Sequence, residues 1–175
     1  MVRKFFFENE KKIRKALPII KEKIKIRLFL KGKIVFIKGD EYTEFMVEKI
    51  LSAIDFGFEI EDALLIMKDY SFNTINIKDY TKRKNLEEIR GRIIGKKGRA
   101  IKIIENISGA KIILKRNKVG IIADNEHIEE TEESIKSLIK GSKHGNVFSF
   151  LERRNTELKK PESDLGLRKP NKKFQ

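Results

Sequence analysis

Two glycines three positions apart, Gly95 and Gly98, enclose Lys96 and Lys97, and this short stretch is the part of the sequence best suited to hold an anion. A glycine has no Cβ, so it can adopt a positive φ and let another backbone approach closely. Apolar residues recur at helical spacing immediately afterwards, and we expect a helix to begin at about Arg99. Amides at the start of a helix carry partial positive charge, to which the two lysines add full charges. The pattern therefore predicts a phosphate-binding turn.

Positive charge is concentrated around this turn. The 175-residue chain carries 40 Lys and Arg against 26 Asp and Glu, a formal net charge of +14 at pH 7. Between positions 90 and 118, ten basic residues face the single carboxylate of Glu105. Nucleic acid is the expected partner of so basic a surface, and an anionic membrane surface is the second candidate. The chain contains no cysteine, which excludes disulfides, thiolate chemistry and cysteine-containing zinc sites.

The turn must be held by the elements around it, and their patterns are readable in the sequence. The expected elements are a strand over 74–78, helices over 85–94 and 99–108, strands over 111–115 and 119–123, and a helix that ends at Gly141. A tight basic loop joins the last two strands. The order is therefore strand, helix, turn, helix, strand, strand, helix.

The first part of the chain repeats this order loosely, which indicates an internal duplication with a period of roughly eighty residues. The expected elements are a strand over 2–7, a helical stretch over 9–23, hairpin strands over 24–30 and 34–37, and helices over 42–55 and 60–68. Pro18 lacks an amide donor, so two short helices or one kinked helix are expected over 9–23. Phe5, Phe6 and Phe7 are expected in the core of the first strand rather than stacked on bases.

The C-terminal part of the chain predicts one more helix and a tail. Val147, Phe150 and Leu151 mark an amphipathic helix, and prolines and lysines beyond about residue 160 indicate a solvated basic tail. No apolar run is long enough for a signal peptide or a membrane span. We therefore expect a soluble, cytoplasmic protein with no membrane partner.

The order of elements around a Gly-Lys-Lys-Gly turn flanked by isoleucines resembles the KH domain. Three sequence segments are together similar to archaeal proteins with two KH domains: AIDFGF at 53–58, GRIIG at 91–95 and HGNVFSFLERR at 144–154. These proteins are related to the partner-of-Nob (Dim/Pno) and Krr factors of small-subunit ribosome assembly, and the likeness covers about residues 1–160. It implies an α+β fold of two tandem KH-like units of type I (β-α-α-β-β-α). These are a degenerate unit over 1–72, a unit with the glycine signature over 73–142, and a C-terminal helix and basic tail over 143–175.

This resemblance implies binding of single-stranded RNA, because the KH glycine turn clamps the backbone of about four unpaired nucleotides. The implied target is the 3′ region of small-subunit rRNA during its maturation, beside the Nob-type endonuclease that trims that end or with other assembly or initiation factors. Amides of residues 96–98 and both lysines would hold consecutive phosphates, the isoleucines would floor a groove for the bases, and the basic loop would form its far wall. The expected RNA-binding residues are Arg92, Ile94, Gly95, Lys96, Lys97, Gly98, Arg99, Ile101, Lys102, Ile113, Arg116 and Lys118.

The first unit departs from the family pattern because the corresponding place has no glycine pair. Residues 8–12 read Glu-Asn-Glu-Lys-Lys, so the backbone cannot approach a phosphate as closely, and Glu8 and Glu10 would repel it. We therefore expect this unit not to grip RNA in the usual way, but to pack against the second unit or to bind a protein.

Two other functions are weighed against RNA binding. The first is an enzyme, because the stretch 91–96 superficially resembles a P-loop. That motif needs four residues between its glycines and a Ser or Thr after the lysine, whereas three residues separate Gly91 from Gly95. We expect no catalytic residue, metal site or cofactor. The second is a protein–protein interaction adapter in a ribosome or translation-initiation complex, which would dock through the first unit and the C-terminal helix, with RNA binding secondary.

Overall fold

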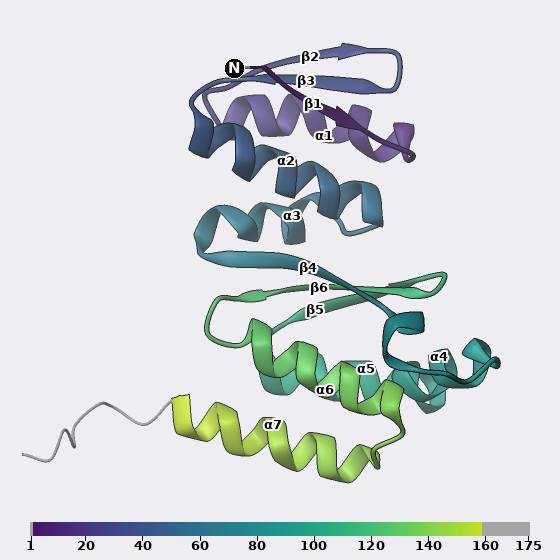
Figure 1. Cartoon of the computed structure of the whole chain (residues 1–175). Coiled ribbons are helices and arrows are strands. Elements are labelled where there is room, and N and C mark those ends of the chain that lie inside the picture. Colours follow the sequence, from purple (N-terminus) through teal and green to yellow (C-terminus); the bar gives the residue numbers. More distant parts are fainter. Residues whose placement is uncertain (1, 159–175) are drawn as a thin grey trace, which may run out of the picture.

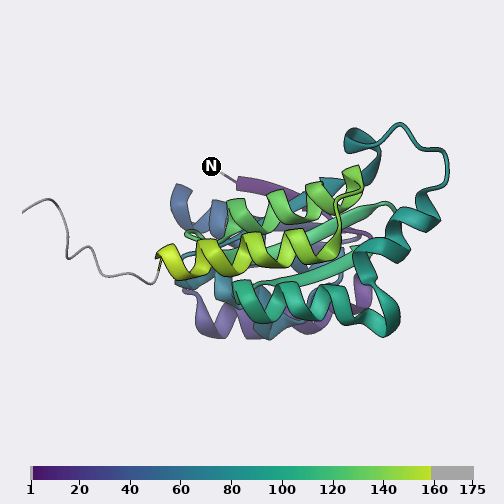
Figure 2. The ribbon, with the colours of Figure 1, turned by 90° about the horizontal axis from the view of Figure 1, so that it is seen from below.

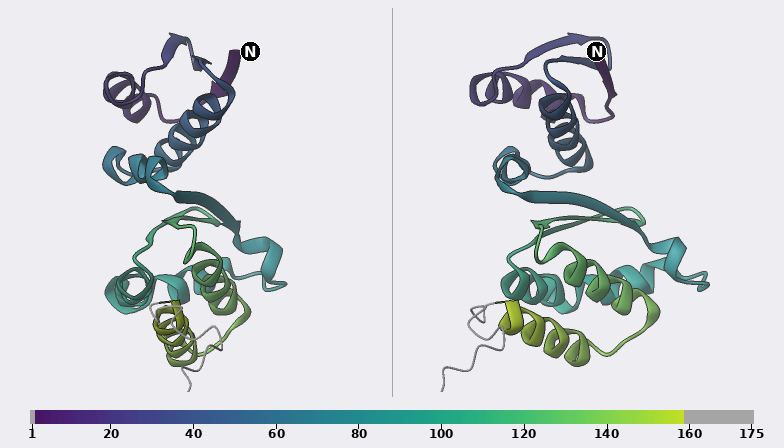
Figure 3. Two further views of the ribbon diagram at one scale, coloured as in Figure 1. Left: turned by 90° about the vertical axis from the view of Figure 1, so that its left-hand side faces the viewer. Right: turned by 60° about the vertical axis from the view of Figure 1, so that its left-hand side comes forward.

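The computed structural model of the chain describes residues 2–158 and stacks two three-stranded antiparallel sheets with their helices in one column (Figure 1). The first sheet belongs to the N-terminal half and the second to the C-terminal half. Helices lie between the sheets and below the second one, and Figure 3 shows the same layering from two other sides. The expected α+β class is confirmed. The basic tail predicted beyond residue 160 lies outside the described residues.

The N-terminal half has nearly the predicted order of elements. These are β1 (Val2–Phe6), α1 (Glu10–Lys23), β2 (Arg27–Lys31), β3 (Ile34–Lys38), α2 (Glu41–Phe56), α3 (Ile60–Ala63) and the 3₁₀ helix η1 (Leu64–Lys68). The strands pair in the order β1-β3-β2. Helix α1 is continuous through Pro18, so of the two expected alternatives a single helix is found rather than two short ones. Pro18 is exposed, while Ile13, Ala16, Leu17 and Ile20 bury the other side of α1 and hold it together across the missing hydrogen bond.

The C-terminal half contains every predicted element. These are β4 (Tyr70–Asn76), η2 (Ile77–Tyr80), α4 (Leu86–Ile94), η3 (Lys96–Gly98), α5 (Arg99–Ser108), β5 (Lys111–Lys115), β6 (Lys118–Asp124), α6 (Ile128–Lys140) and α7 (His144–Leu158). Strand β4 begins at Tyr70, earlier than predicted, and so crosses the boundary drawn after residue 72. The strands pair in the order β4-β6-β5, which repeats the arrangement of the first sheet.

The second sheet is covered on both faces, because successive side chains of a strand point to opposite sides. Ile112, Val119 and Ile121 are buried with side chains of the C-terminal helices. Ile122 is buried among side chains of the N-terminal half, and Ile113 packs against the same cluster. This sheet is therefore the layer on which the two halves meet.

Three phenylalanine rings form the centre of that contact. The ring centroids of Phe56, Phe58 and Phe72 lie between 5.7 and 6.1 Å apart. A Cβ on Gly120 of β6 would lie 2.5 Å from Cε1 of Phe56 and 2.9 Å from Cε2 of Phe58, so glycine permits this close approach of strand and rings. The two halves therefore pack directly against each other at these rings.

Helix α7 covers the lower side of the C-terminal half, against α5 and α6 (Figures 1 and 2). Val147 and Leu151 are buried there, and Phe150 packs against the same cluster. Nδ2 of Asn155 donates a hydrogen bond of 2.6 Å to the carbonyl oxygen of Ile107. The apolar side of this helix, considered above as a docking surface, is thus occupied by the chain itself. Within residues 2–158, no helix combines the length and apolar character needed to cross a bilayer.

Candidate nucleic-acid interface

Residues 95–98 turn the chain between α4 and α5, and Gly95 fixes the shape of the turn. Gly95 has φ 73° and ψ 174°, a backbone region essentially confined to glycine. A Cβ at this position would lie 2.5 Å from the Cβ and 2.8 Å from the nitrogen of Ala100. Gly98 has φ 75° and ψ 11° but faces open space. The first glycine therefore allows a close contact, whereas the second only supplies a left-handed conformation.

Hydrogen bonds inside the turn decide which amides remain for a ligand. The Gly98 amide donates to the carbonyl oxygen of Gly95 at 3.1 Å, and the Arg99 amide donates to that of Lys96. The Gly98 amide is therefore engaged within the turn and does not have the outward role expected of it. The amides of Lys96 and Lys97 precede these bonds and are the two that could meet a phosphate. Lys97 itself is left-handed at φ 55°, a conformation found in anion-binding nests.

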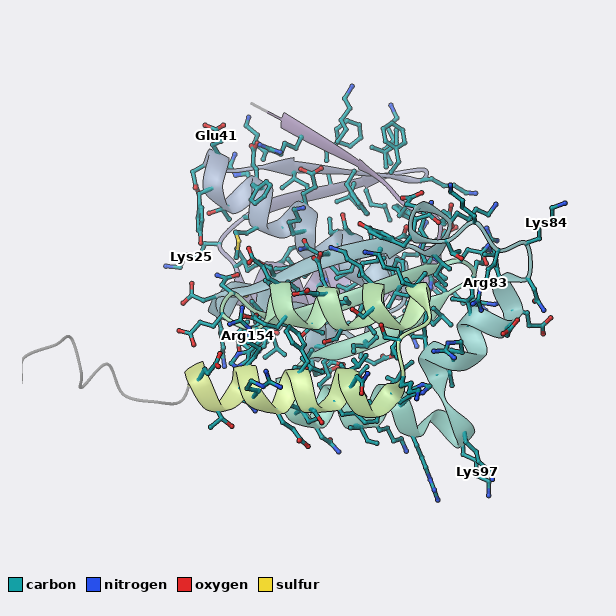
Figure 4. The ribbon with its side chains drawn as sticks, turned by 60° about the horizontal axis from the view of Figure 1, so that its bottom comes forward. Lys25, Glu41, Arg83, Lys84, Lys97 and Arg154 are labelled. Carbon is teal, nitrogen blue, oxygen red and sulfur yellow. The ribbon has the colours of Figure 1, made fainter. Side chains whose placement is uncertain are left out.

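The cations around the turn are free of carboxylates. Lys96, Lys97, Arg99 and Lys102 are exposed, and none forms an ion pair with any carboxylate of residues 2–158. Figure 4 shows the side chain of Lys97 projecting away from the ribbon. Four unpaired cations within the turn and the first turn of α5 create a locally positive potential that attracts phosphate.

Apolar side chains lie beside the turn, but not all of those predicted. Ile94 is 37% exposed and Ile101 is half-buried. Ile113 does not join them, because it lies on the opposite face of the second sheet, packed against the N-terminal half. Leu114, the next residue, is half-buried on the helical side with Ile101. Sequence reasoning missed Leu114, although alternation from the buried Ile112 is a signal that points to it.

The remaining predicted cations divide into two groups. Arg92 is half-buried, and its Nη2 donates to the carbonyl oxygen of Ser142 at 2.8 Å, so it ties α4 to the connection between α6 and α7. The carbonyl oxygen of Arg92 lies 2.8 Å from Nε2 of His144 at the start of α7. Arg116 and Lys118 are exposed at the tip of the β5–β6 hairpin, where they line a cleft between the two halves. The hairpin therefore offers free cations, whereas the guanidinium of Arg92 is engaged.

A basic loop that sequence reasoning did not single out projects beside α4. Lys82, Arg83 and Lys84 are exposed between η2 and α4, on a loop that stands away from the rest of the fold (Figures 2 and 4). Nη1 of Arg83 lies 3.7 Å from the carboxylate of Glu88, whereas Lys82 and Lys84 have no such partner among the described residues. The consecutive basic residues were the available signal. This loop and the glycine turn place cations at both ends of α4.

The corresponding turn of the N-terminal half is filled by the chain itself. The amides of Glu8 and Asn9, just before α1, both donate to Oδ1 of Asp55, at 2.8 and 2.6 Å. Nζ of Lys12 donates to the carboxylate of Glu59 at 2.7 Å, which lowers the pKa of that carboxyl. The donors at this end of α1 are thus occupied by acceptors of the same chain.

Comparison of sequences places the chain among KH proteins. Residues 71–156 match the family model of a eukaryotic-type KH domain (KH-domain type I), the second KH domain of PNO1. A KH domain-containing protein of Methanocaldococcus jannaschii is 33% identical over 122 residues, which cover 69% of this chain and 54% of that protein. The pre-rRNA-processing protein PNO1 of Candida albicans is 31% identical over 144 residues, 77% of this chain and 52% of that protein. The chain spans about half the length of these curated relatives.

Solved structures extend the similarity over both halves. The crystal structure of Dim2p from Pyrococcus horikoshii has a TM-score of 0.77 at 28% identity, and the match covers 87% of this chain and 99% of that one. A chain of the a/eIF2alpha–aDim2p–rRNA complex from the same organism has a TM-score of 0.76 at 28% identity, with 90% and 95% covered. The fold is therefore KH-like, and the similarity to the Dim2p structure covers the N-terminal half as well as residues 71–156.

Proposed function

This chain is a relative of the PNO1 and Dim2 proteins with a type I KH domain in residues 71–156, and we propose that it binds single-stranded RNA through residues 95–98 during maturation of small-subunit rRNA. The glycine turn carries the proposal. It combines two amides without partners in the turn, two unpaired ammonium groups and the start of a ten-residue helix at one exposed point. This combination suits consecutive phosphates and has no other evident use in the fold.

The surroundings of the turn suggest how the rest of the strand would lie. If the phosphates bound at Lys96 and Lys97, the bases would lie over Ile94, Ile101 and Leu114. These are the partly exposed apolar residues on that side of the turn. The cations of the β5–β6 hairpin and of the loop 82–84 would widen the footprint along the backbone. Each single-strand phosphate neutralised steepens the dependence of log K on log salt by about 0.7, so binding should be strongly salt-sensitive.

The proposal that the RNA is ribosomal is based on the names of the relatives. PNO1 of Candida albicans is called a pre-rRNA-processing protein, and archaeal Dim2p was crystallised with rRNA and a/eIF2alpha. On this basis, together with the family resemblance, the proposed RNA is the 3′ region of small-subunit rRNA. The proposed protein partners are a Nob-type endonuclease or an initiation factor, and the proposed compartment is the cytoplasm.

The two halves are proposed to be tandem KH-like units, the first of them degenerate. Both sheets have the same strand order, and each half follows its first strand with a helical segment, a hairpin and a further helix. The boundary would fall at Asp69, a left-handed residue between η1 and β4, and α7 would be a C-terminal addition. Because Asp55 fills the turn before α1, the first unit would support the second and leave phosphate binding to residues 95–98.

The decisive experiment reverses charge at the turn. The double variant Lys96→Asp with Lys97→Asp should lose binding to a short single-stranded RNA, while circular dichroism and melting temperature stay nearly unchanged because both side chains are exposed. The control variant Lys21→Asp with Lys25→Asp makes the same charge change at exposed positions away from the turn and should retain most of the binding. In the milder variant Lys96→Ala, the salt slope should fall by about 0.7. Unaltered RNA affinity in the first double variant would refute the assignment.

A further inference from the structure

The outer face of the β1-β3-β2 sheet carries aromatic rings with nothing packed on them. Phe6 and Phe29 are 68% and 58% exposed. The strand register places Phe6, Phe29 and the half-buried Phe36 on the same face, because Phe29 pairs with Phe36 and Phe36 pairs with Lys4, two residues before Phe6. Helices α1 and α2 cover the opposite face, and Figures 1 and 3 show no described element above this one.

The same face is basic throughout. Lys4, Arg27, Lys31 and Lys38 share it by register, and the three strands contain no Asp or Glu. None of these four cations forms an ion pair with a described carboxylate, whereas Arg3 on the inner face pairs with Glu44 and Glu48 of α2. Nζ of Lys4 lies 5.9 Å from the centroid of the Phe36 ring. By register Lys4 lies opposite Phe36, and Arg27 and Lys31 flank Phe29 along β2, so unpaired cations adjoin the rings.

The corresponding face of the second sheet is buried, in contrast to this one. It is covered by the N-terminal half, with Phe72 and Ile122 buried and Gly120 leaving room for the rings of Phe56 and Phe58. The first sheet has the same strand order but exposes large rings and carries charges of one sign. A face required only for folding would not need exposed phenylalanines among unpaired cations.

We propose that this face, defined by Phe6, Phe29, Phe36, Lys4, Arg27 and Lys31, is a second binding surface for single-stranded RNA. Bases stack on the exposed rings, and the ammonium and guanidinium groups contact the phosphates between them. Sequence-tolerant binding of single strands is commonly built from these two components, aromatic platforms and basic grooves.

A cleft connects this surface to the C-terminal half, which favours a nucleic-acid strand over an acidic protein as its occupant. Phe6 lines the same cleft as Lys78, Arg116 and Lys118 of the C-terminal half. Two carboxylates also line the cleft: that of Glu8 lies 3.9 Å from Nζ of Lys115, and Oδ1 of Asp55 accepts hydrogen bonds from two backbone amides. A strand longer than the glycine turn can clamp would therefore meet the cations of the hairpin and Lys78 on its way to the sheet.

The test compares a short and a long unstructured oligouridylate, of about 5 and about 20 nucleotides, since the glycine turn clamps about four. Phe6→Ala with Phe29→Ala should weaken binding of the long RNA by about fivefold to about a hundredfold per ring, and leave the short RNA unaffected. Phe6→Tyr with Phe29→Tyr keeps both rings and should restore affinity. The control Tyr42→Ala with Phe45→Ala removes two exposed rings of α2 and should change neither affinity.

The outcomes separate this proposal from the function of the glycine turn. The Lys96→Asp and Lys97→Asp double variant loses the short RNA, whereas the sheet variants lose only the additional affinity for the long one. Lys4→Ser with Lys31→Ser gives an independent measurement that leaves the rings in place, and it should also weaken only the long RNA. Unchanged affinity of the sheet variants for the long RNA would overturn the proposal. The proposal would also be overturned if the sheet variants no longer bound a purified protein partner but kept their affinity for the long RNA. That result would assign the face to protein binding.

Discussion

Replacing each glycine of the turn by alanine separates a close contact from a backbone requirement. Gly95→Ala would bring a Cβ to 2.5 Å from the Cβ of Ala100 and 2.8 Å from its nitrogen, so something must move. A non-glycine residue in this backbone region costs about 1–3 kcal/mol. Overpacking against Ala100 adds about 1–3 kcal/mol. We therefore expect the free energy of unfolding to fall by roughly 2–6 kcal/mol.

Gly98→Ala should be milder, because a Cβ at that position meets nothing within 4 Å. The remaining cost is that of an L-residue in the left-handed region, about 1–2 kcal/mol. RNA affinity should follow the same order. Moving Ala100 displaces the start of α5 and with it the amides of Lys96 and Lys97, whereas a methyl group on Gly98 leaves that arrangement in place.

Urea denaturation followed by circular dichroism measures the stabilities, and fluorescence anisotropy with a short labelled RNA measures the affinities. Gly91→Ala is the matched control, since Gly91 lies inside α4 with open space around it and should gain about 0.5–1 kcal/mol as alanine. If Gly95→Ala proved no more destabilising than Gly98→Ala, contact with Ala100 would not be what fixes the turn.

Two further predictions concern the scaffold. Gly120→Ala should lower the free energy of unfolding by about 1–3 kcal/mol in urea denaturation, because its Cβ would overlap the Phe56 ring at 2.5 Å, and equal stability would show that the halves adjust freely. The hydrogen bond that Nζ of Lys136 donates to the carboxylate of Glu132 raises the pKa of Lys136 above its ordinary 10.5, so this pair stabilises the fold below that pH and the contribution is lost as pH rises through the raised pKa. Glu132→Gln should therefore make the loss of stability in alkaline solution less steep, and urea denaturation on both sides of pH 10.5 that gave identical pH profiles for variant and wild type would contradict this.

The elements nearest the turn were predictable because their signals are local. Asn85 accepts a hydrogen bond from the Glu88 amide and begins α4, Gly109 ends α5 in the left-handed region, and hairpin residues separate β5 from β6. Each signal depends on residues within one turn of chain. Pro18 shows the limit of such reasoning, because local propensity left two short helices and one helix as alternatives, and the buried side of α1 maintains a single helix.

Residues whose environment is set by distant parts of the chain were harder to place. Ile113 and Leu114 are equally apolar, and only the docking of the N-terminal half decides that Ile113 faces away from the turn. Arg92 looks like one more cation in the sequence, but its partner Ser142 comes from the connection between α6 and α7. The exposed rings of β1 and β2 were missed for the same reason, since the strand pattern alone does not reveal which face a neighbouring layer leaves uncovered.

The turns before α1 and before α5 differ in whether the chain itself supplies an acceptor. Before α1, the amides of Glu8 and Asn9 converge on one oxygen of Asp55, so this backbone can hold an anion and already does. Before α5, no carboxylate of the described chain forms an ion pair with Lys96 or Lys97, and both residues are exposed. An internal carboxylate makes the first turn part of the scaffold, because displacing it would leave two amides unpaired. Its absence at the second turn leaves room for an external phosphate, so under the proposed function the division of roles between the two halves would follow from where the acceptor comes from.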